Sequence, residues 1–365
     1  MHKVEQWAKE VQEKIIHKLR GTALEIGSRC PHAEHGGIYD NQPISWWTNG
    51  FWPGILWTAY RATREPLFLN MARACEKQLD QVLREYVHTD HDAGFMWSLA
   101  AVADYKITGN PKAKTRGLVA ANYLAGRFHL TGNYIQAWNG KSGWAIIDCM
   151  MNLPLLYWTS EMVNDGRYRA MAQAHTRTVL EHFCRPDGSV NHIVAFDPET
   201  GEVDNIPQGQ GAAPDSKWAR GTSWAVYGFA LGYGYTKNQE YLEQAKKTAD
   251  FFLEQLPEDH VCYWDFAVPV TPETPRDTSA AACAASGMIE IFRHSGEQKY
   301  LDGAVAILQG LTEHFADFTL SCQQLLNGGT GNFPQGDNIN VGLIYGDYFY
   351  FEAVNKLCGE KGLFW

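Results

Sequence analysis

The sequence contains no hydrophobic run long enough to cross a membrane. A spanning helix needs about 20 mostly apolar residues, and nothing in this 365-residue chain approaches that pattern. The segment 1–21, MHKVEQWAKEVQEKIIHKLRG, is charged throughout and lacks the apolar core and small-residue cleavage site of a signal peptide. We therefore expect a cytoplasmic protein with no membrane partner.

Cysteines with the C-x-x-C spacing of zinc sites and redox motifs are also absent. Several cysteines lie in apolar helical contexts, such as ARACEKQL (72–79). Scattered thiols of this kind are typical of buried, reduced cysteines in a cytoplasmic protein. We therefore expect no disulfide framework and no metal site from the eight cysteines, which are Cys30, Cys75, Cys149, Cys184, Cys262, Cys283, Cys322 and Cys358.

Basic runs are missing as well, and the net charge is -10. Affinity for nucleic acid comes largely from neutralising phosphates with Lys and Arg, so nucleic acid is excluded as a partner. A short anionic ligand held by one or two cations is still compatible with this charge. The 13 tryptophans stand out, because aromatic faces stack on sugar rings. The alternative is that most of them fill a core.

An apolar period near 3.6 residues recurs along the chain and predicts helices. Segments rich in Gly, Ala, Ser and aromatics alternate with segments charged on one face, such as LEQAKKTADFFLEQL (242–256). Helices that are apolar all round are buried, and amphipathic helices cover them. We therefore predict an all-α (α/α)6 toroid in a single domain, 1–365, with helices at 3–26, 49–63, 65–85, 93–108, 111–127, 144–162, 166–183, 219–235, 238–255, 277–294, 297–316 and 341–357.

The segment 184–218 is the one long gap between these helices. Its HIVAF and DPETGEV stretches predict a β-hairpin or an extended loop. A connection of this length in a compact domain is usually functional.

The motif HTDHDAGF (88–95) packs two histidines and two aspartates into five residues. Two interpretations of Asp92 are open. It is either the N-cap of the following helix or a second carboxylate beside Asp148, holding its proton through like-charge repulsion. We interpret His88, Asp90 and His91 as loop or capping residues and not as metal ligands, because no third ligand cluster is evident elsewhere.

Asp148 lies in the otherwise apolar stretch WAIIDCMMNLPLLYW (144–158). On a helix it would share one face with Trp144 and Asn152 at i−4 and i+4. A buried carboxylate costs several kcal/mol unless it is paired or functional, and loss of solvent favours the protonated form that a general acid needs. The structural alternative is an Asp that pairs with an Arg or caps a neighbouring helix.

Arg220 and Trp224 share a helix face at i and i+4, and Trp218 precedes them. A guanidinium beside indole rings is suited to a uronic acid, since the cation meets the carboxylate and the ring stacks on the sugar. An Arg tied to a structural Asp is the alternative. His192 and Gln210 lie in the long loop, where the residues alone indicate solvated side chains.

Several motifs together resemble the unsaturated glucuronyl hydrolases of glycoside hydrolase family 88. They occur in the order of that family over nearly the whole chain, and they are HDAGF, IIDCMMNLPLLYW, DPETG, QGQG, SKWARGTSWAVYGFAL, YWDFAVP, RDTSAAACAASG and GDYFYFEA.

This resemblance implies an (α/α)6 barrel that removes a Δ4,5-unsaturated glucuronic acid from the non-reducing end of lyase-generated oligosaccharides. In that family the C4=C5 vinyl ether is hydrated, and no cofactor takes part. By motif position Asp148 is similar to the family's acid/base and Asp92 to its carboxylate partner. The resemblance implies substrate-holding roles for Trp46, Trp138, His192, Gln210, Trp218, Arg220 and Trp224.

One segment departs from the family. Some members carry a Ser-x-x-Ser-x-Lys loop that is associated with sulfated substrates, whereas this chain reads GGTGNFPQGDN (328–338) there. We therefore expect a preference for unsulfated disaccharides. Three rival interpretations are an unsaturated rhamnogalacturonyl hydrolase acting on pectin fragments, an oligosaccharide-binding toroid without turnover, and a sugar 2-epimerase. The last would need a histidine pair on the inner helices, and the sequence places none there.

Overall fold

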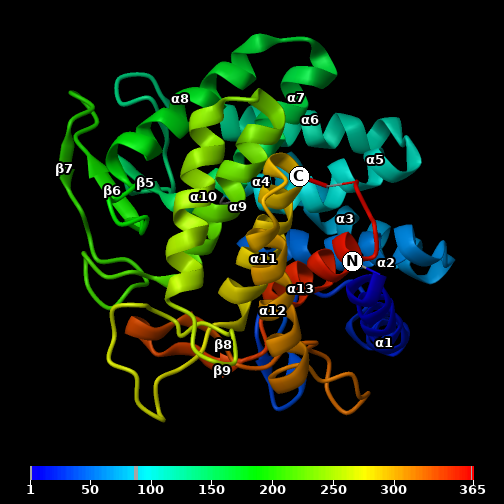
Figure 1. Cartoon of the computed structure of the whole chain (residues 1–365). Helices are drawn as coiled ribbons and strands as arrows, with labels where there is room; N and C mark the ends of the chain where they lie inside the picture. The colour runs from blue at the N-terminus through cyan, green and yellow to red at the C-terminus, as the bar shows by residue number, and fades with distance from the viewer. Residues whose placement is uncertain (1, 86–88, 363) are drawn as a thin grey trace.

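A computed structural model describes residues 2–85, 89–362 and 364–365, so His88 lies outside the described residues. Helices dominate this part of the chain (Figure 1). In order they are α1 (His2–Ile26), α2 (Phe51–Thr63), α3 (Pro66–Glu85), α4 (Ala93–Trp97), α5 (Ala103–Thr108), α6 (Pro111–Ala125), α7 (Leu153–Val163), α8 (Gly166–His182), α9 (Ala219–Thr236), α10 (Gln239–Glu254), α11 (Thr278–Ser295), α12 (Gln298–His314) and α13 (Ile344–Leu357).

The inner helices close into a ring. Helix α13 packs against α2, α2 against the π-helical turn η2 (Ser98–Val102) that joins α4 to α5, α4 against α7, α7 against α9, α9 against α11, and α11 against α13. Outer helices α1, α3, α6, α8, α10 and α12 each cover a member of this ring. The predicted (α/α)6 architecture is therefore confirmed.

Burial follows the composition of the two kinds of helix. In α9 every residue from Ala219 to Gly232 is buried, as expected for a helix that is apolar all round. In α10 the buried residues recur at helical spacing and include Tyr241, Ala245, Thr248 and Phe252, while the opposite face is charged. None of the described helices combines the length and apolarity needed to cross a membrane.

Two predicted helices are interrupted in the structure. The predicted helix 93–108 contains the π-helical turn η2. The predicted helix 144–162 is wrong at its start, because Trp144–Ile146 form strand β5, Ile147–Met151 form the 3-10 helix η3, and α7 begins only at Leu153. Strand β5 pairs with residues 193–195, so partners remote in sequence override the local helical period.

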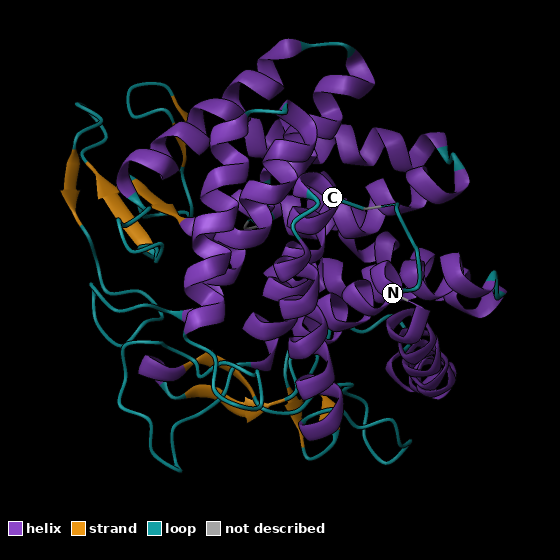
Figure 2. Ribbon diagram, in the orientation of Figure 1, coloured by secondary structure: helices purple, strands orange, loops and turns teal. Residues whose placement is uncertain are grey.

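The strands lie at the edges of the helical body (Figure 2). The predicted hairpin within 184–218 is confirmed as β6 (Ile193–Phe196) and β7 (Val203–Asn205), and β5 (Trp144–Ile146) joins it in a three-stranded sheet. A second hairpin, β8 (Gly329–Asn332) and β9 (Asp337–Val341), precedes α13. The remaining two-residue strands are β1 (Glu34–His35), β2 (Ile38–Tyr39), β3 (Phe128–His129) and β4 (Tyr134–Ile135).

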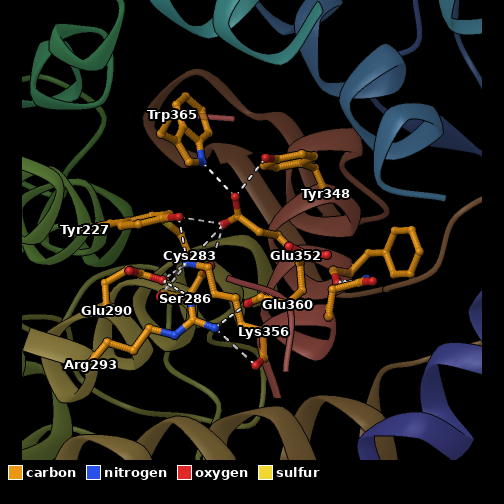
Figure 3. Close-up of polar contacts among 12 residues, drawn as sticks. Tyr227, Cys283, Ser286, Glu290, Arg293, Tyr348, Glu352, Lys356, Glu360 and Trp365 are labelled. Atoms are coloured by element: carbon orange, nitrogen blue, oxygen red, sulfur yellow. Dashed lines mark hydrogen bonds and ion pairs between the residues drawn. The ribbon is translucent and has the colours of Figure 1, made fainter. Parts of the chain in front are cut away.

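A buried polar network fills the ring at the middle and C-terminal turns of its helices (Figure 3). Glu352 Oε1 accepts hydrogen bonds from the Tyr348 hydroxyl and the Trp365 indole, each at 2.8 Å. Its Oε2 accepts from the Tyr227 hydroxyl at 2.9 Å and the Ser286 hydroxyl at 2.5 Å. The network therefore ties α9, α11, α13 and the segment around Trp365 together.

Lys356 is the cation at the centre of this network, and Arg293 pairs with Glu290 at its edge. The Nζ of Lys356 donates to the Tyr227 hydroxyl at 2.7 Å and to the Ser286 carbonyl at 3.0 Å. It also lies 3.1 Å from Glu290 Oε1 and 3.6 Å from Glu352 Oε2. Lys356, Glu290 and Glu352 are all buried, so their mutual contacts replace the water that each group has lost.

Candidate active site

The loops and first helical turns at one end of the ring enclose a cavity of about 700 Å³. Asp92 precedes α4, Arg220 lies in the first turn of α9, and Tyr345 lies in the first turn of α13. This volume is within the range of small-molecule sites. The cavity is lined by His32, Pro43, Ser45, Trp46, Trp47, Asp90, Asp92, Trp138, Gln210, Arg220, Gly331, Asn332, Gln335, Asp337, Asn338 and Tyr345.

Close helix packing brings the Asp92 and Asp148 segments together. Gly94, two residues after Asp92, lies so near Asn152 that a Cβ on the glycine would be 2.3 Å from the Asn152 Cα. Only glycine allows this approach. Asn152 Nδ2 in turn lies 3.4 Å from Asp92 Oδ1.

Asp92 is buried, and its environment favours the protonated carboxyl. Burial raises the pKa of Asp92 well above its usual value, and the negative charges of Asp90 and Asp148 raise it further. Asp92 occupies the N-cap position of α4, but its side chain makes no capping hydrogen bond. Of the two interpretations left open by the sequence, the structure therefore favours a second carboxylate beside Asp148.

Asp148 lies on η3 and not on an α-helix, so the predicted stripe with Trp144 and Asn152 is wrong. Its side chain is 17% exposed. The Oδ2 atom is buried without a hydrogen-bond partner among the described residues, and His192 Nε2 lies 3.5 Å from it. The carboxyl therefore has one enclosed oxygen, next to His192.

His91 lies in the turn before α4, as the sequence indicated, but it is not solvated there. Its ring is fully buried, and its Nδ1 lies 3.2 Å from Asn152 Nδ2 and 3.5 Å from Asp92 Oδ1. Burial lowers the pKa of His91 to about 3, against an opposing effect of Asp148. Asp90 does behave as a turn residue, since its Oδ1 accepts the Asp92 backbone N–H at 3.0 Å, but its side chain also lines the cavity.

Arg220 makes the pair with a structural Asp that the sequence left open as one alternative, and it also lines the cavity. Its Nη1 donates to Asp277 Oδ2 at 2.7 Å and to the Thr330 carbonyl at 2.5 Å. Its Nη2 donates to Gln210 Oε1 and to the Gly331 carbonyl, each at 2.5 Å. The guanidinium thus connects three segments of the cavity wall, and its charge is paired with Asp277.

The tryptophans divide between cavity and core. Trp46 is 38% exposed and lines the cavity together with Trp138. Trp218 is buried, with its ring 4.3 Å from that of His192 and 4.6 Å from the Arg220 guanidinium carbon. Trp224 is fully buried against aromatic side chains and is not part of the cavity lining. Of the expected site residues, Trp46, Asp92, Trp138, Gln210 and Arg220 line the cavity, whereas Asp148, His192, Trp218 and Trp224 are not among its lining residues.

Sequence reasoning missed His32, Tyr345 and the polar side chains of the β8–β9 hairpin. His32 is buried between the Trp46, Trp47 and Tyr345 rings, and burial lowers its pKa to about 4. Nothing in its local sequence indicates this position. The hairpin covers most of the segment 328–338 that departs from the family in sequence, although its contribution to the cavity was not predicted.

A metal site is not evident in this region. Across residues 2–85, 89–362 and 364–365, no group of three or more His, Cys, Asp or Glu side chains is arranged to hold a metal ion.

Comparison with known proteins identifies the class of the chain. Residues 7–316 match the model of Glycosyl Hydrolase Family 88. The unsaturated chondroitin disaccharide hydrolase of Streptococcus pneumoniae is 35% identical, over 97% of this chain and 92% of that protein. The chain therefore belongs to glycosyl hydrolase family 88, a family of glycosidases.

Solved structures agree with this assignment. The unsaturated glucuronyl hydrolase of Bacillus sp. GL1, described as responsible for the degradation of glycosaminoglycan, superposes with a TM-score of 0.92 and 34% identity, covering 97% of this chain and 96% of that one. A variant of the Streptococcus agalactiae enzyme, solved with dGlcA-GalNAc6S, gives a TM-score of 0.88 and 31% identity, covering 99% and 94% of the two chains.

Proposed function

We propose that this protein releases Δ4,5-unsaturated glucuronic acid from the non-reducing end of lyase-generated glycosaminoglycan or related oligosaccharides. The observation that carries this proposal is a buried Asp92, close enough to Asp148 to feel its charge, in the wall of a cavity that Arg220, Trp46 and Trp138 also line. A uronate needs a cation near its carboxylate and an apolar face for its ring. The names of the family relatives support the same substrate class.

In the proposed reaction Asp148 acts first as an acid and then as a base. Its proton passes to C4 of the vinyl ether, and the resulting cation at C5 is stabilised by the ring oxygen. Water adds to C5 and returns a proton to Asp148. The hemiketal opens and expels the remaining sugar. A single carboxyl serves both steps because it regains in the second the proton that it gave in the first.

The proposed roles of the remaining residues follow from their contacts. Asp92, kept protonated by burial, can donate a hydrogen bond to the sugar. Gln210 Oε1 is occupied by Arg220, which leaves the Gln210 amide N–H groups for the uronate carboxylate. Trp46 and Trp138 offer ring faces in the cavity, whereas His192 and Trp218 support Asp148 and Arg220 from the side. We propose that Trp224 supports these residues from the core and does not contact the substrate.

The test uses the chromophore of the substrate. The conjugated C4=C5 bond absorbs near-ultraviolet light, so turnover makes the absorbance of an unsaturated disaccharide fall, whereas binding alone leaves it unchanged. We expect Asp148→Asn to abolish the fall and to retain binding, and the control Asp204→Asn, on the exposed strand β7, to be fully active. Near-normal turnover by Asp148→Asn would reassign the acid. If the parent protein turned over no unsaturated uronate, the alternative of an oligosaccharide-binding toroid without turnover would be favoured.

We further propose a preference for unsulfated substrates. The β8–β9 hairpin contributes Asn332, Gln335, Asp337 and Asn338 to the cavity lining, and the segment 327–342 contains neither Lys nor Arg. A sulfate near this wall would face amides and one carboxylate. A panel of sulfated and unsulfated chondroitin and pectin-derived disaccharides also discriminates the rhamnogalacturonyl alternative, because only that activity would favour the pectin fragments.

Two wider proposals complete this assignment. We propose that 1–365 form one catalytic domain, since a single core cluster extends from Val11 to Trp365. We also propose that the protein works in the cytoplasm, where free thiols persist. All eight cysteines belong to the described residues and are unpaired.

A further inference from the structure

His192 connects a backbone amide to the buried oxygen of Asp148. On one side of its ring, Nδ1 accepts the Gln210 backbone N–H at 2.9 Å. On the other side, Nε2 lies 3.5 Å from Asp148 Oδ2. The His192 backbone is fixed as well, because its carbonyl accepts the Ile147 N–H at 3.0 Å, one residue before Asp148. The imidazole therefore has little freedom to rotate.

The Gln210 bond determines which nitrogen of His192 carries the proton. A backbone N–H can only donate, so Nδ1 must be an unprotonated acceptor. The ring is then the neutral Nε2–H tautomer, so the nitrogen that carries the proton is the one 3.5 Å from Asp148 Oδ2. The separation of 3.5 Å is long for a hydrogen bond, but contacts between catalytic groups are often long in the free enzyme and shorten in the substrate complex.

We propose that His192 is a positioning residue whose Nε2–H, set by the Gln210 amide, reserves Asp148 Oδ2 as an acceptor and leaves Oδ1 to carry the transferable proton. This inference rests on the proposed function, which assigns the acid/base role to Asp148. The Oδ1–H bond breaks as the C4–H bond forms. When the oxygen of water bonds to C5, a water proton returns to Oδ1.

Gly209 makes this arrangement sterically feasible. A Cβ at this position would lie 1.8 Å from His192 Nδ1 and 2.7 Å from its Cγ. Both ring atoms belong to a side chain packed against Trp218, so they cannot move aside without losing contacts. Any larger residue at 209 would displace the His192 ring and break the hydrogen bond from the Gln210 N–H to Nδ1, which sets the tautomer of the ring.

Two isosteric substitutions separate positioning from a structural role. His192→Gln keeps a donor near the Nε2 position and loses the Nδ1 acceptor, whereas His192→Asn keeps the acceptor for Gln210 and loses the donor to Asp148. We expect His192→Asn to lower kcat about tenfold or more below His192→Gln, with similar KM values. The reverse order would mean that His192 only anchors the loop, and a change confined to KM would mean that it only holds substrate. Either result overturns the proposal.

Gly209→Ala tests the same arrangement without altering His192. We expect it to lower kcat as His192→Asn does, with an unchanged circular-dichroism spectrum. Gly166→Ala is the matched control, because a Cβ there meets no atom within 4 Å. Full activity in Gly209→Ala would overturn the steric argument.

A spectroscopic readout keeps this inference separable from the proposed function. In protein labelled with ¹⁵N-histidine, the His192 signals are assigned by their loss in His192→Asn. We expect Nδ1 to have the nitrogen shift of an unprotonated ring atom at neutral pH and to lose it in Gly209→Ala. A protonated Nδ1 would refute the proposal. An unprotonated Nδ1 in a protein that turns over no unsaturated uronate would refute the proposed function and leave the tautomer assignment intact.

Discussion

Arg220 Nη1 lies 2.7 Å from Asp277 Oδ2, and both side chains are buried. The other oxygen of Asp277 accepts the backbone N–H groups of Ser279 and Ala280 and so caps α11. One carboxylate thereby neutralises the cation of the cavity and fixes the start of the next inner helix. Since Arg220 also holds the Thr330 carbonyl, this pair connects α9, α11 and the β8–β9 hairpin.

We predict that Asp277→Ala destabilises the fold strongly. It leaves Arg220 buried without its anionic partner, which costs about 3–5 kcal/mol in comparable pairs, and it removes a helix cap. Urea unfolding measures the loss. Asp277→Asn retains a capping oxygen and should recover part of the stability, whereas the KM for the uronate should rise in both variants as the guanidinium shifts.

The control for this prediction is Asp250→Asn, which breaks the exposed Lys299–Asp250 pair. Exposed pairs contribute about 0.2–1 kcal/mol, so its free energy of unfolding should change little. An equal loss in Asp250→Asn and Asp277→Ala would show that burial of the Arg220 pair is not the cause.

We predict that Asp92→Asn stabilises the protein increasingly as the pH rises above about 4, while it lowers kcat about 100-fold or more. Burial raises the pKa of Asp92, with smaller effects of Asp90 and Asp148. A carboxyl with a raised pKa stabilises the fold fully below its unfolded pKa near 3.8, and this contribution is lost as the pH rises through the folded value. Asparagine does not ionise, so the difference in stability between the two proteins should grow with pH.

Urea unfolding of the parent protein and Asp92→Asn at several pH values between about 4 and 8 checks this prediction. If the free energies of unfolding of the two proteins changed with pH in parallel, ionisation of Asp92 would cost the folded protein no stability, and the prediction would be wrong. Asp204→Asn, on the exposed strand β7, should leave the parent profile unchanged.

The sequence was sufficient to predict the ring of helices but not the local backbone at Asp148. Inner and outer helices differ in composition, and this difference is repeated along the chain, so the architecture is a consequence of many residues at once. The structure at Trp144–Ile146 depends instead on pairing with β6. Because the pairing strand β6 lies almost fifty residues away in the sequence, the spacing of apolar residues near Asp148 does not reveal it.

The same distinction applies to the site. Asp148 and Arg220 were detectable because a charge in an apolar stretch is unusual. The four hydrogen-bond acceptors of Arg220 were not detectable from the sequence, since two of them, Thr330 and Gly331, lie more than 100 residues away. His32 was undetectable, because its place depends on the bond from its backbone N–H to Asp40 Oδ1 at 2.7 Å and on the Ile344 N–H that its carbonyl accepts.

We predict that Asp337→Lys shifts selectivity toward sulfated disaccharides. Asp337 is an exposed carboxylate at the start of β9 in the cavity wall, so the substitution exchanges repulsion of a sulfate for attraction. Exposed charge pairs are weak, and we expect the ratio of kcat/KM for sulfated over unsulfated substrate to rise about threefold to tenfold. Added salt should reduce the shift by screening. An unchanged ratio would place the second sugar away from this hairpin.

We predict that Lys356→Met destabilises the fold without altering the chemistry of the folded enzyme. Lys356 lies three turns along α13 from the cavity residue Tyr345, so no substrate contact is lost. Its removal leaves Glu352 buried without a cation, while Glu290 keeps Arg293 at 2.8 Å, at a cost of about 3–5 kcal/mol. Unfolding midpoints measure the loss, and kcat and KM at low temperature should match the parent values. Lys299→Met, at an exposed ion pair, is the matched control and should change the midpoint little. Equal stability of the two lysine variants would show that Lys356 does not stabilise the buried network.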